Sequence, residues 1–150
     1  MERFLRKRYM QETIETMELV VLKMKGTDFV TDIKCEKMNP KILMLMALGK
    51  CAGLTALSIF KKMDIRPESF EIECRGEIST PTLVAESVFT AVNIVYTVEC
   101  QTLAEQGRVS RALNLTHDKY CGMVKMMRKV APLSHEIYIH STRPVSEKVK

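Results

Sequence analysis

The feature that most constrains this chain is an almost uncharged stretch over residues 42–60, in which Lys50 is the one charged side chain. An Asn-Pro pair opens the stretch, and Asn is favoured as a helix N-cap while Pro is favoured at the first helical position. Two lysines close it, at the end where cations interact well with the helix dipole. We therefore predict one long helix over residues 40–63.

A helix of this length and composition is compatible with a membrane span or with a buried core helix. A lysine at the centre of a span costs about 2.5 to 3.5 kcal/mol on insertion scales, and the apolar run is barely long enough to cross a bilayer. Gly49 and Gly53 lie four residues apart on one helix face, which permits close approach of another backbone. We expect a core helix wedged between neighbours, and no membrane partner.

The segments around this helix predict an α+β fold in a single domain of 150 residues. Residues 18–25 and 29–35 are typical of two strands of a hairpin, and residues 70–75 alternate apolar and charged side chains as a half-buried strand does. The other predicted elements are a strand over 88–100, a helix over 103–115, a helix over 117–130 capped by Thr116 with Tyr120, Met123, Val124 and Met127 facing inward, and a strand over 135–141.

The formal net charge of +5 is concentrated at the two ends of the chain. Residues 1–8 and 143–150 carry the whole basic excess, so we predict two solvated tails and a body without the one-signed surface that nucleic acid would need. The charged first residues also lack the apolar stretch of a secretory signal. We expect a cytoplasmic protein with no nucleic-acid partner.

The five cysteines include no CxxC pair and no zinc-ligand spacing, so neither structural disulfides nor a metal site is expected in a reducing cytosol. Free cysteine usually packs as a small hydrophobe. Cys35, Cys74 and Cys100 fall at predicted strand positions, where packing is a sufficient interpretation. On residue type alone, the same would hold for Cys51 in the long helix.

Two motifs change the interpretation of Cys51 and Cys121. The Asn-Pro pair followed by residues 45–55, LMALGKCAGLT, resembles the central helix of the OsmC/Ohr family, in which an Ala/Gly-rich turn precedes the reactive cysteine. Residues 111–121, RALNLTHDKYC, are similar to the YhfA-like branch of that family, where a Lys-Tyr-Cys follows a helix of the same kind. The resemblance covers roughly residues 29–140.

This resemblance implies an OsmC-like fold, with antiparallel sheets wrapped around long central helices in an intertwined homodimer. It also implies a thiol-dependent peroxidase that reduces organic hydroperoxides in oxidative stress defence. Cys51 would attack the peroxide and become a sulfenic acid, and Cys121 would capture it as a disulfide. The implied partners are a hydroperoxide substrate and an external thiol or dithiol reductant, without a cofactor.

The activating groups of the hydroperoxide-resistance branch are not evident here. That branch uses an N-terminal arginine and a glutamate just after the Asn-Pro pair, whereas this chain has Lys41 in the glutamate's place. Lys41 is either a solvated side chain or a cation that holds a thiolate. Lys50 precedes Cys51 but points about 100° away from it, so an ion pair with a partner subunit is an equal alternative.

The surroundings of the second cysteine leave further alternatives open. His117, four residues before Cys121, is either a catalytic base or polar surface. If Cys121 lies in the first turn of a helix, backbone amides and the helix dipole lower its pKa.

Two functions therefore remain open at this point. The first is the thiol peroxidase, whose apolar central helix would offer organic peroxides a hydrophobic pocket. The alternative is a non-catalytic OsmC-like dimer that binds an apolar small molecule, which Lys41 in place of glutamate favours. A disulfide between Cys51 and Cys121 on oxidation would distinguish them.

Overall fold

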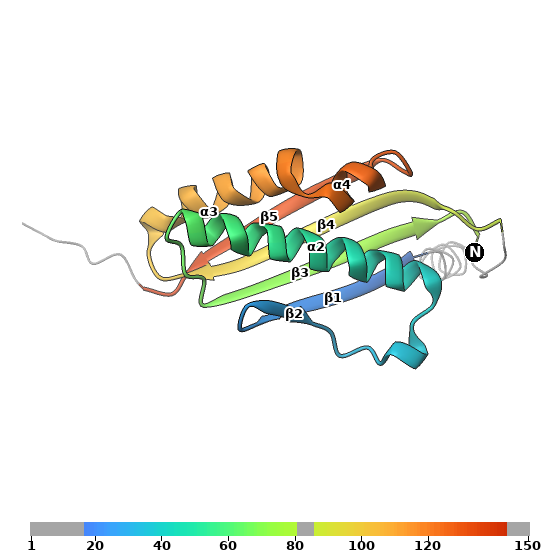
Figure 1. The fold of residues 1–150 in the computed structure, drawn as a ribbon, viewed down its shortest axis with the longest axis horizontal. Coiled ribbons are helices and arrows are strands. Elements are labelled where there is room, and N and C mark those ends of the chain that lie inside the picture. The colour runs from blue at the N-terminus through green and yellow to red at the C-terminus, as the bar shows by residue number, and fades with distance from the viewer. Residues whose placement is uncertain (1–16, 81–85, 144–150) are drawn as a thin grey trace, which may run out of the picture.

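The computed structural model describes residues 17–80 and 86–143. Helices α2 and α3 lie side by side across one face of a five-stranded sheet, as Figure 1 shows. Of the two basic tails that we predicted, residues 1–8 lie outside the described residues, and so do residues 144–150 of the tail predicted over 143–150. In chain order the elements are β1 (Met17–Lys25), β2 (Asp28–Val30), the 3-10 turn η1 (Cys35–Lys37), α2 (Pro40–Lys62), β3 (Ser69–Ile78), β4 (Phe89–Cys100), α3 (Leu103–Leu115), the π-helical turn η2 (Thr116–Tyr120), α4 (Gly122–Met127) and β5 (Leu133–Ser141).

The sheet has the strand order β2-β1-β3-β4-β5 and is mixed. The first four strands pair antiparallel, but β5 pairs parallel with β4. Parallel neighbours need a long crossover connection, which α3, η2 and α4 provide here. The prediction of antiparallel sheets therefore holds for four strands and is wrong for β5.

Helix α2 confirms the prediction made from the uncharged stretch. The Asn39 side chain accepts a hydrogen bond from the backbone N–H of Ile42 at 2.9 Å, and Pro40 is the first helical residue. A Cβ atom built on Gly49 would lie 2.9 Å from the Cys74 sulfur, and one on Gly53 would lie 2.5 Å from the Phe29 ring. The two glycines therefore allow α2 to lie close to the sheet and the N-terminal hairpin.

Within the described residues, α2 is the one helix long and apolar enough to cross a membrane. It packs on the sheet through buried residues that include Leu45, Leu48 and Phe60. On its other face, Leu43, Met44 and Leu54 are 43%, 41% and 40% exposed. One packed face and one exposed apolar face are the arrangement of a core helix that can take a further neighbour.

The N-terminal hairpin forms as predicted, but its second strand is shorter. β2 ends at Val30, because the chain then leaves the sheet edge to reach Asn39 at the start of α2, where the Asn39 amide donates to Glu18 at 2.9 Å. Cys35 consequently lies in η1 and is exposed. The interpretation of Cys35 as a packed strand residue was wrong.

The segment after α3 also differs from its prediction. Helix α3 has the predicted bounds, but Thr116 does not cap a new helix: its hydroxyl donates to the Ala112 carbonyl at 2.9 Å, and the helix continues through η2. The new helix is α4, which starts after Cys121 and has six residues. Tyr120 is 54% exposed and does not face inward.

Candidate functional site

Two cysteines 70 positions apart in the sequence meet between α2 and the start of α4. The Cys121 thiol donates a hydrogen bond to the Cys51 sulfur across 3.5 Å. Cys51 is half-buried and Cys121 is fully buried, and both are free thiols. The structure therefore brings together the two cysteines that the motifs selected.

The π-helical turn η2 positions Cys121. The backbone N–H of Cys121 donates to the Thr116 carbonyl at 3.0 Å and closes the wide turn. Cys121 itself has extended backbone angles, and its carbonyl accepts from the Lys125 N–H at 3.2 Å as the N-cap of α4. Single π turns within helices are frequent at functional sites. Because of this turn, the chain changes direction at Cys121, and Cys121 lies next to α2.

Burial controls the ionisation of Cys121. It raises the pKa of Cys121 to about 11, although the backbone N–H groups of Val124 and Met123 donate to the sulfur and oppose this shift, and the hydrogen bond to Cys51 raises the pKa further. The prediction of a lowered pKa at a helix start was wrong, because desolvation outweighs the few amides of a short helix. At neutral pH the proton stays on Cys121, which leaves the Cys51 sulfur as the acceptor.

The other two strand cysteines are buried, as the packing interpretation predicted. Cys74 on β3 is fully buried, and burial raises its pKa to about 12, with smaller contributions from the charges of Glu73 and Cys121. Cys74 is therefore a third sulfur near the thiol pair. Cys100 lies at the end of β4, where its thiol donates to the Thr102 carbonyl at 3.4 Å.

The two lysines that we considered as activating groups are not directed at the thiol pair. Lys50 forms an ion pair with Asp28 at 3.3 Å between the ammonium nitrogen and the carboxylate oxygen. This ion pair joins α2 to β2, on the opposite side of α2 from α4 in Figure 1. Lys41 lies in the first turn of α2, about 15 Å along the helix from Cys51 at 1.5 Å per residue.

His117 is a buried residue, so its interpretation as polar surface was wrong. Its ring stacks on that of His135, with centroids 3.8 Å apart and an angle of 25° between the planes. His135 in turn contacts the Asn114 side-chain oxygen through Nε2 at 3.0 Å. Burial lowers the pKa of His117 to about 4, and the charge of His135 adds to this effect. His117 is therefore neutral near pH 7.

Two further residues of this region were not identified from the sequence. Tyr96 on β4 is fully buried, and burial together with the charges of Cys74 and Cys121 raises its pKa. Arg128, just after α4, donates to the His117 carbonyl at 2.9 Å and lies 3.6 Å from Asp118. A tyrosine among the apolar residues of a buried strand face was the available signal for Tyr96, and no local pattern marks Arg128.

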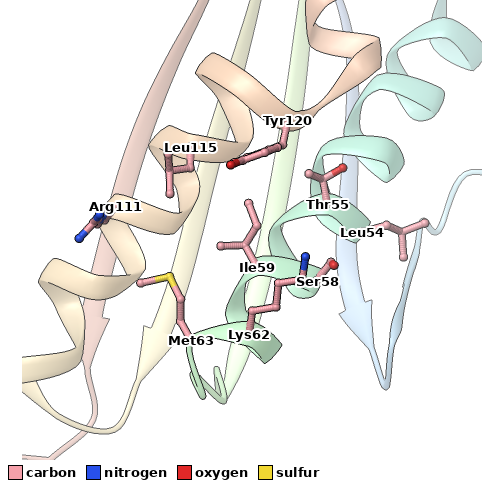
Figure 2. A pocket seen from close by; sticks show the side chains of 9 residues that line it. All are labelled: Leu54, Thr55, Ser58, Ile59, Lys62, Met63, Arg111, Leu115 and Tyr120. Carbon is pink, nitrogen blue, oxygen red and sulfur yellow. The ribbon is translucent and has the colours of Figure 1, made fainter.

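A groove of about 750 Å³ lies between α2 and the segment formed by α3 and η2 (Figure 2). Thr55 lies one helical turn after Cys51 in α2, and Tyr120 directly precedes Cys121, so this end of the groove adjoins the thiol pair. The opposite end carries the cations Lys62 and Arg111. The lining residues are Leu54, Thr55, Ser58, Ile59, Lys62, Met63, Arg111, Leu115 and Tyr120.

Residues 17–80 and 86–143 contain no group of three or more His, Cys, Asp or Glu side chains that could hold a metal ion.

Known proteins with the same helix-covered sheet identify the family of this chain. The family described as OsmC-like protein matches residues 31–136, and this chain belongs to that family. Protein YhfA of Escherichia coli strain K12 is 27% identical over 100 residues, which cover 65% of this chain and 69% of YhfA. The predicted resemblance to the OsmC/Ohr family and to YhfA is thereby confirmed.

Solved structures show the same fold. An OsmC-like protein from Mycoplasma pneumoniae superposes with a TM-score of 0.57 at 9% identity, over 82% of this chain and 96% of that one. An OsmC-like hydroperoxide resistance protein from Jannaschia sp. CCS1 has a TM-score of 0.53 at 15% identity, over 75% of this chain and 85% of that one. These similarities confirm the predicted α+β OsmC-like fold.

Proposed function

We propose that this protein reduces organic hydroperoxides with Cys51 as the attacking thiol and Cys121 as the resolving thiol. The observation that carries the proposal is the hydrogen bond of 3.5 Å between the two sulfurs. Cys51 is the partner with access to solvent, whereas Cys121 is buried and keeps its proton. The names of related structures, such as the hydroperoxide resistance protein from Jannaschia, support the same chemistry.

The proposed cycle uses no cofactor. The Cys51 thiolate attacks the terminal oxygen of the hydroperoxide and the O–O bond breaks. The alkoxide leaves and is then protonated to an alcohol. Cys121 then attacks the sulfur of the Cys51 sulfenic acid, which forms the disulfide and releases water. One dithiol, or two external thiols, reduces this disulfide and becomes oxidised. The sulfurs must approach from 3.5 Å to about 2.05 Å for the second step.

The groove supports an organic peroxide over hydrogen peroxide as substrate. Its apolar side chains, among them Ile59 and Leu115, can bury the hydrocarbon part of such a molecule. The end formed by Thr55 and Tyr120 would then present the peroxide to Cys51. His117 is neutral and its Nδ1 has no hydrogen-bond partner within the described residues. Because its pKa is lowered to about 4, it is too weak a base to take the Cys121 proton, which leaves in the released water instead.

We infer that the protein works as a homodimer in the cytoplasm, where thiol reductants are present. The exposed apolar face of α2, with Leu43, Met44 and Leu54, supports association with a second copy. Sedimentation equilibrium would test this. A Met44→Lys variant should dissociate the dimer, whereas a Val88→Lys variant at an exposed position outside α2 should not.

The test of the enzyme treats the fully reduced protein with one equivalent of cumene hydroperoxide and maps disulfides by non-reducing peptide mass spectrometry. We expect a disulfide between Cys51 and Cys121 within seconds, and no disulfide at Cys121 in a Cys51→Ser variant. Cys100→Ser is the matched control and should behave as the parent does. Thiols that stay reduced, or that oxidise no faster than Cys74, would refute the peroxidase.

The alternative function is a dimer that binds an apolar small molecule without chemistry, and the size of the groove favours it. This function predicts binding of a fluorescent apolar probe that is equally tight in the parent and in a Cys51→Ser, Cys121→Ser double variant. It also predicts no disulfide on addition of cumene hydroperoxide.

A further inference from the structure

Tyr96 combines complete burial with a polar group that lacks a partner. Its side chain has 0% exposure, and its hydroxyl makes no hydrogen bond within the described residues. A buried, unsatisfied hydroxyl costs stability, so each such group in a folded protein calls for a physical explanation. The large apolar ring explains the burial of Tyr96 but not its oxygen atom, because a phenylalanine would fill the same space.

Tyr96 lies on the helix-covered face of the sheet, and the charges of Cys74, Cys121 and Cys51 act on its hydroxyl. Cys74 and His135 lie on either side of Ile94 in the sheet, two residues before Tyr96 on the same face. The Tyr96 ring contacts His135 edge to face with centroids 6.4 Å apart. His135 stacks in turn on His117 in η2, the turn that ends at Cys121, so Tyr96 and this turn share a neighbour. A Cβ atom on Gly49 would touch the Cys74 sulfur, so this row lies directly under α2.

We propose that the Tyr96 hydroxyl donates a hydrogen bond to the Cys121 sulfur while that sulfur attacks Cys51, and so accelerates closure of the disulfide. This inference rests on the proposed function. The step balances as follows: the S–S bond forms, the S–O bond of the Cys51 sulfenic acid breaks, and the Cys121 proton leaves in the released water. Tyr96 keeps its own proton throughout.

Cys121 needs such a donor because burial disfavours its thiolate. The Val124 and Met123 amides already donate to this sulfur from one side and do not offset the burial. These amides belong to α4, whereas Tyr96 belongs to β4 of the sheet, and it would donate from there. Burial raises the pKa of Tyr96, so the hydroxyl stays a donor over the whole working range of pH.

The other ionisable groups around this site do not titrate where the thiols do. The pKa of His117 is lowered to about 4 and that of His135 is also lowered, so both rings are neutral above about pH 7. The groups that face the site are Cys51 from α2, Cys74 from β3, His135 from β5, His117 from η2, and Cys121 and Arg128 at the two ends of α4.

The test separates closure of the disulfide from any reaction with peroxide. Protein with the exposed Cys35 changed to Ser is treated with dithiobis(nitrobenzoate). Reaction at Cys51 releases one coloured thiolate, and attack by Cys121 on the resulting mixed disulfide releases a second. In Tyr96→Phe we expect an unchanged first release, a second release about tenfold slower, and a shift of its pH midpoint to higher pH. Tyr138→Phe, which removes an exposed hydroxyl bonded to Glu136, should change neither release.

The outcomes discriminate between the proposals. A second release in Tyr96→Phe within twofold of the parent rate, at equal thermal stability, overturns the role of Tyr96. Slowing of both releases together with a lower melting temperature also overturns it, because the effect would then be structural. A slowed second release in a protein that does not react with cumene hydroperoxide would support the role of Tyr96 in disulfide exchange and refute the peroxidase alone.

Discussion

The two sides of helix α2 offer a comparison between thiols of similar position and different access. Toward the sheet, Cys74 is fully buried, and its pKa is raised to about 12 by burial. Toward the groove, Cys51 is half-buried, with Cys121 at 3.5 Å. Both sulfurs lie near Cys121, so proximity does not separate them. Cys51 has the access to solvent that Cys74 lacks, and under the proposed function this access makes Cys51 the attacking sulfur.

The largest expected effect concerns the thiols themselves. Cys51→Ser should lower the rate of cumene hydroperoxide consumption with a dithiol at least 100-fold, because the attacking atom is lost. Cys74→Ala should keep more than half of the parent rate, since Cys74 is closed off from the groove. Peroxide consumption assays on both variants check this. Equal losses in the two variants would show that the comparison between the two sides of α2 is mistaken.

The buried side chain of His117 should control part of the stability of the protein in acid. His117 has its pKa lowered to about 4 from 6.5 by burial, so below pH 6.5 the unfolded chain binds a proton that the folded protein does not bind. Stability is therefore lost as the pH falls from about 6.5 to about 4, by up to about 3 kcal/mol. Urea unfolding at pH 4.5 and pH 7 should show a smaller difference in His117→Phe than in the parent. Replacing the exposed His140 with Gln is the control, and an unchanged difference in His117→Phe would contradict this account.

The tight approach of α2 to the sheet should be sensitive to one methyl group. In Gly49→Ala the new Cβ atom would lie 2.5 Å from Leu22 Cδ1 and 2.9 Å from the Cys74 sulfur, so we expect a loss of about 2 kcal/mol in the free energy of unfolding. Gly107→Ala on exposed α3 has nothing within 4 Å of the new atom and should gain about 0.5 to 1 kcal/mol. Thermal or urea unfolding measures both changes. Equal changes of the same sign would show that α2 has room to shift.

The groove side of α2 should determine which peroxide the protein prefers. Ile59→Asp places a charge in the groove, away from the sulfurs, and should lower kcat/KM for cumene hydroperoxide about tenfold by weakening burial of its hydrocarbon part. Hydrogen peroxide has no such part, so its kcat/KM should change less than twofold. Steady-state kinetics with both peroxides test this. A parallel decrease for both would mean that the groove is not the substrate site.

The reasons for the successes and failures of the sequence predictions are physical. The start and end of α2 depend on local signals, namely the Asn39 cap, Pro40 and the terminal lysines, and these were predictable. The burial of His117 depends on its stacking with His135 from a strand 18 positions away in the sequence, which no local pattern reveals. The pKa of Cys121 also depends on desolvation by neighbours from α2 and the sheet, so the helix-start argument alone had the wrong sign.

The separation of 70 positions between Cys51 and Cys121 has a consequence for the topology of the chain. A disulfide there would close a covalent ring that contains the end of α2, strands β3 and β4, and helix α3. A cross-link over a loop of this length lowers the conformational entropy of the unfolded chain by the equivalent of about 4 kcal/mol at 25 °C. Oxidation would then stabilise the folded state and reduction would remove this stabilisation. The resistance of the protein to unfolding would therefore follow the redox state of its surroundings.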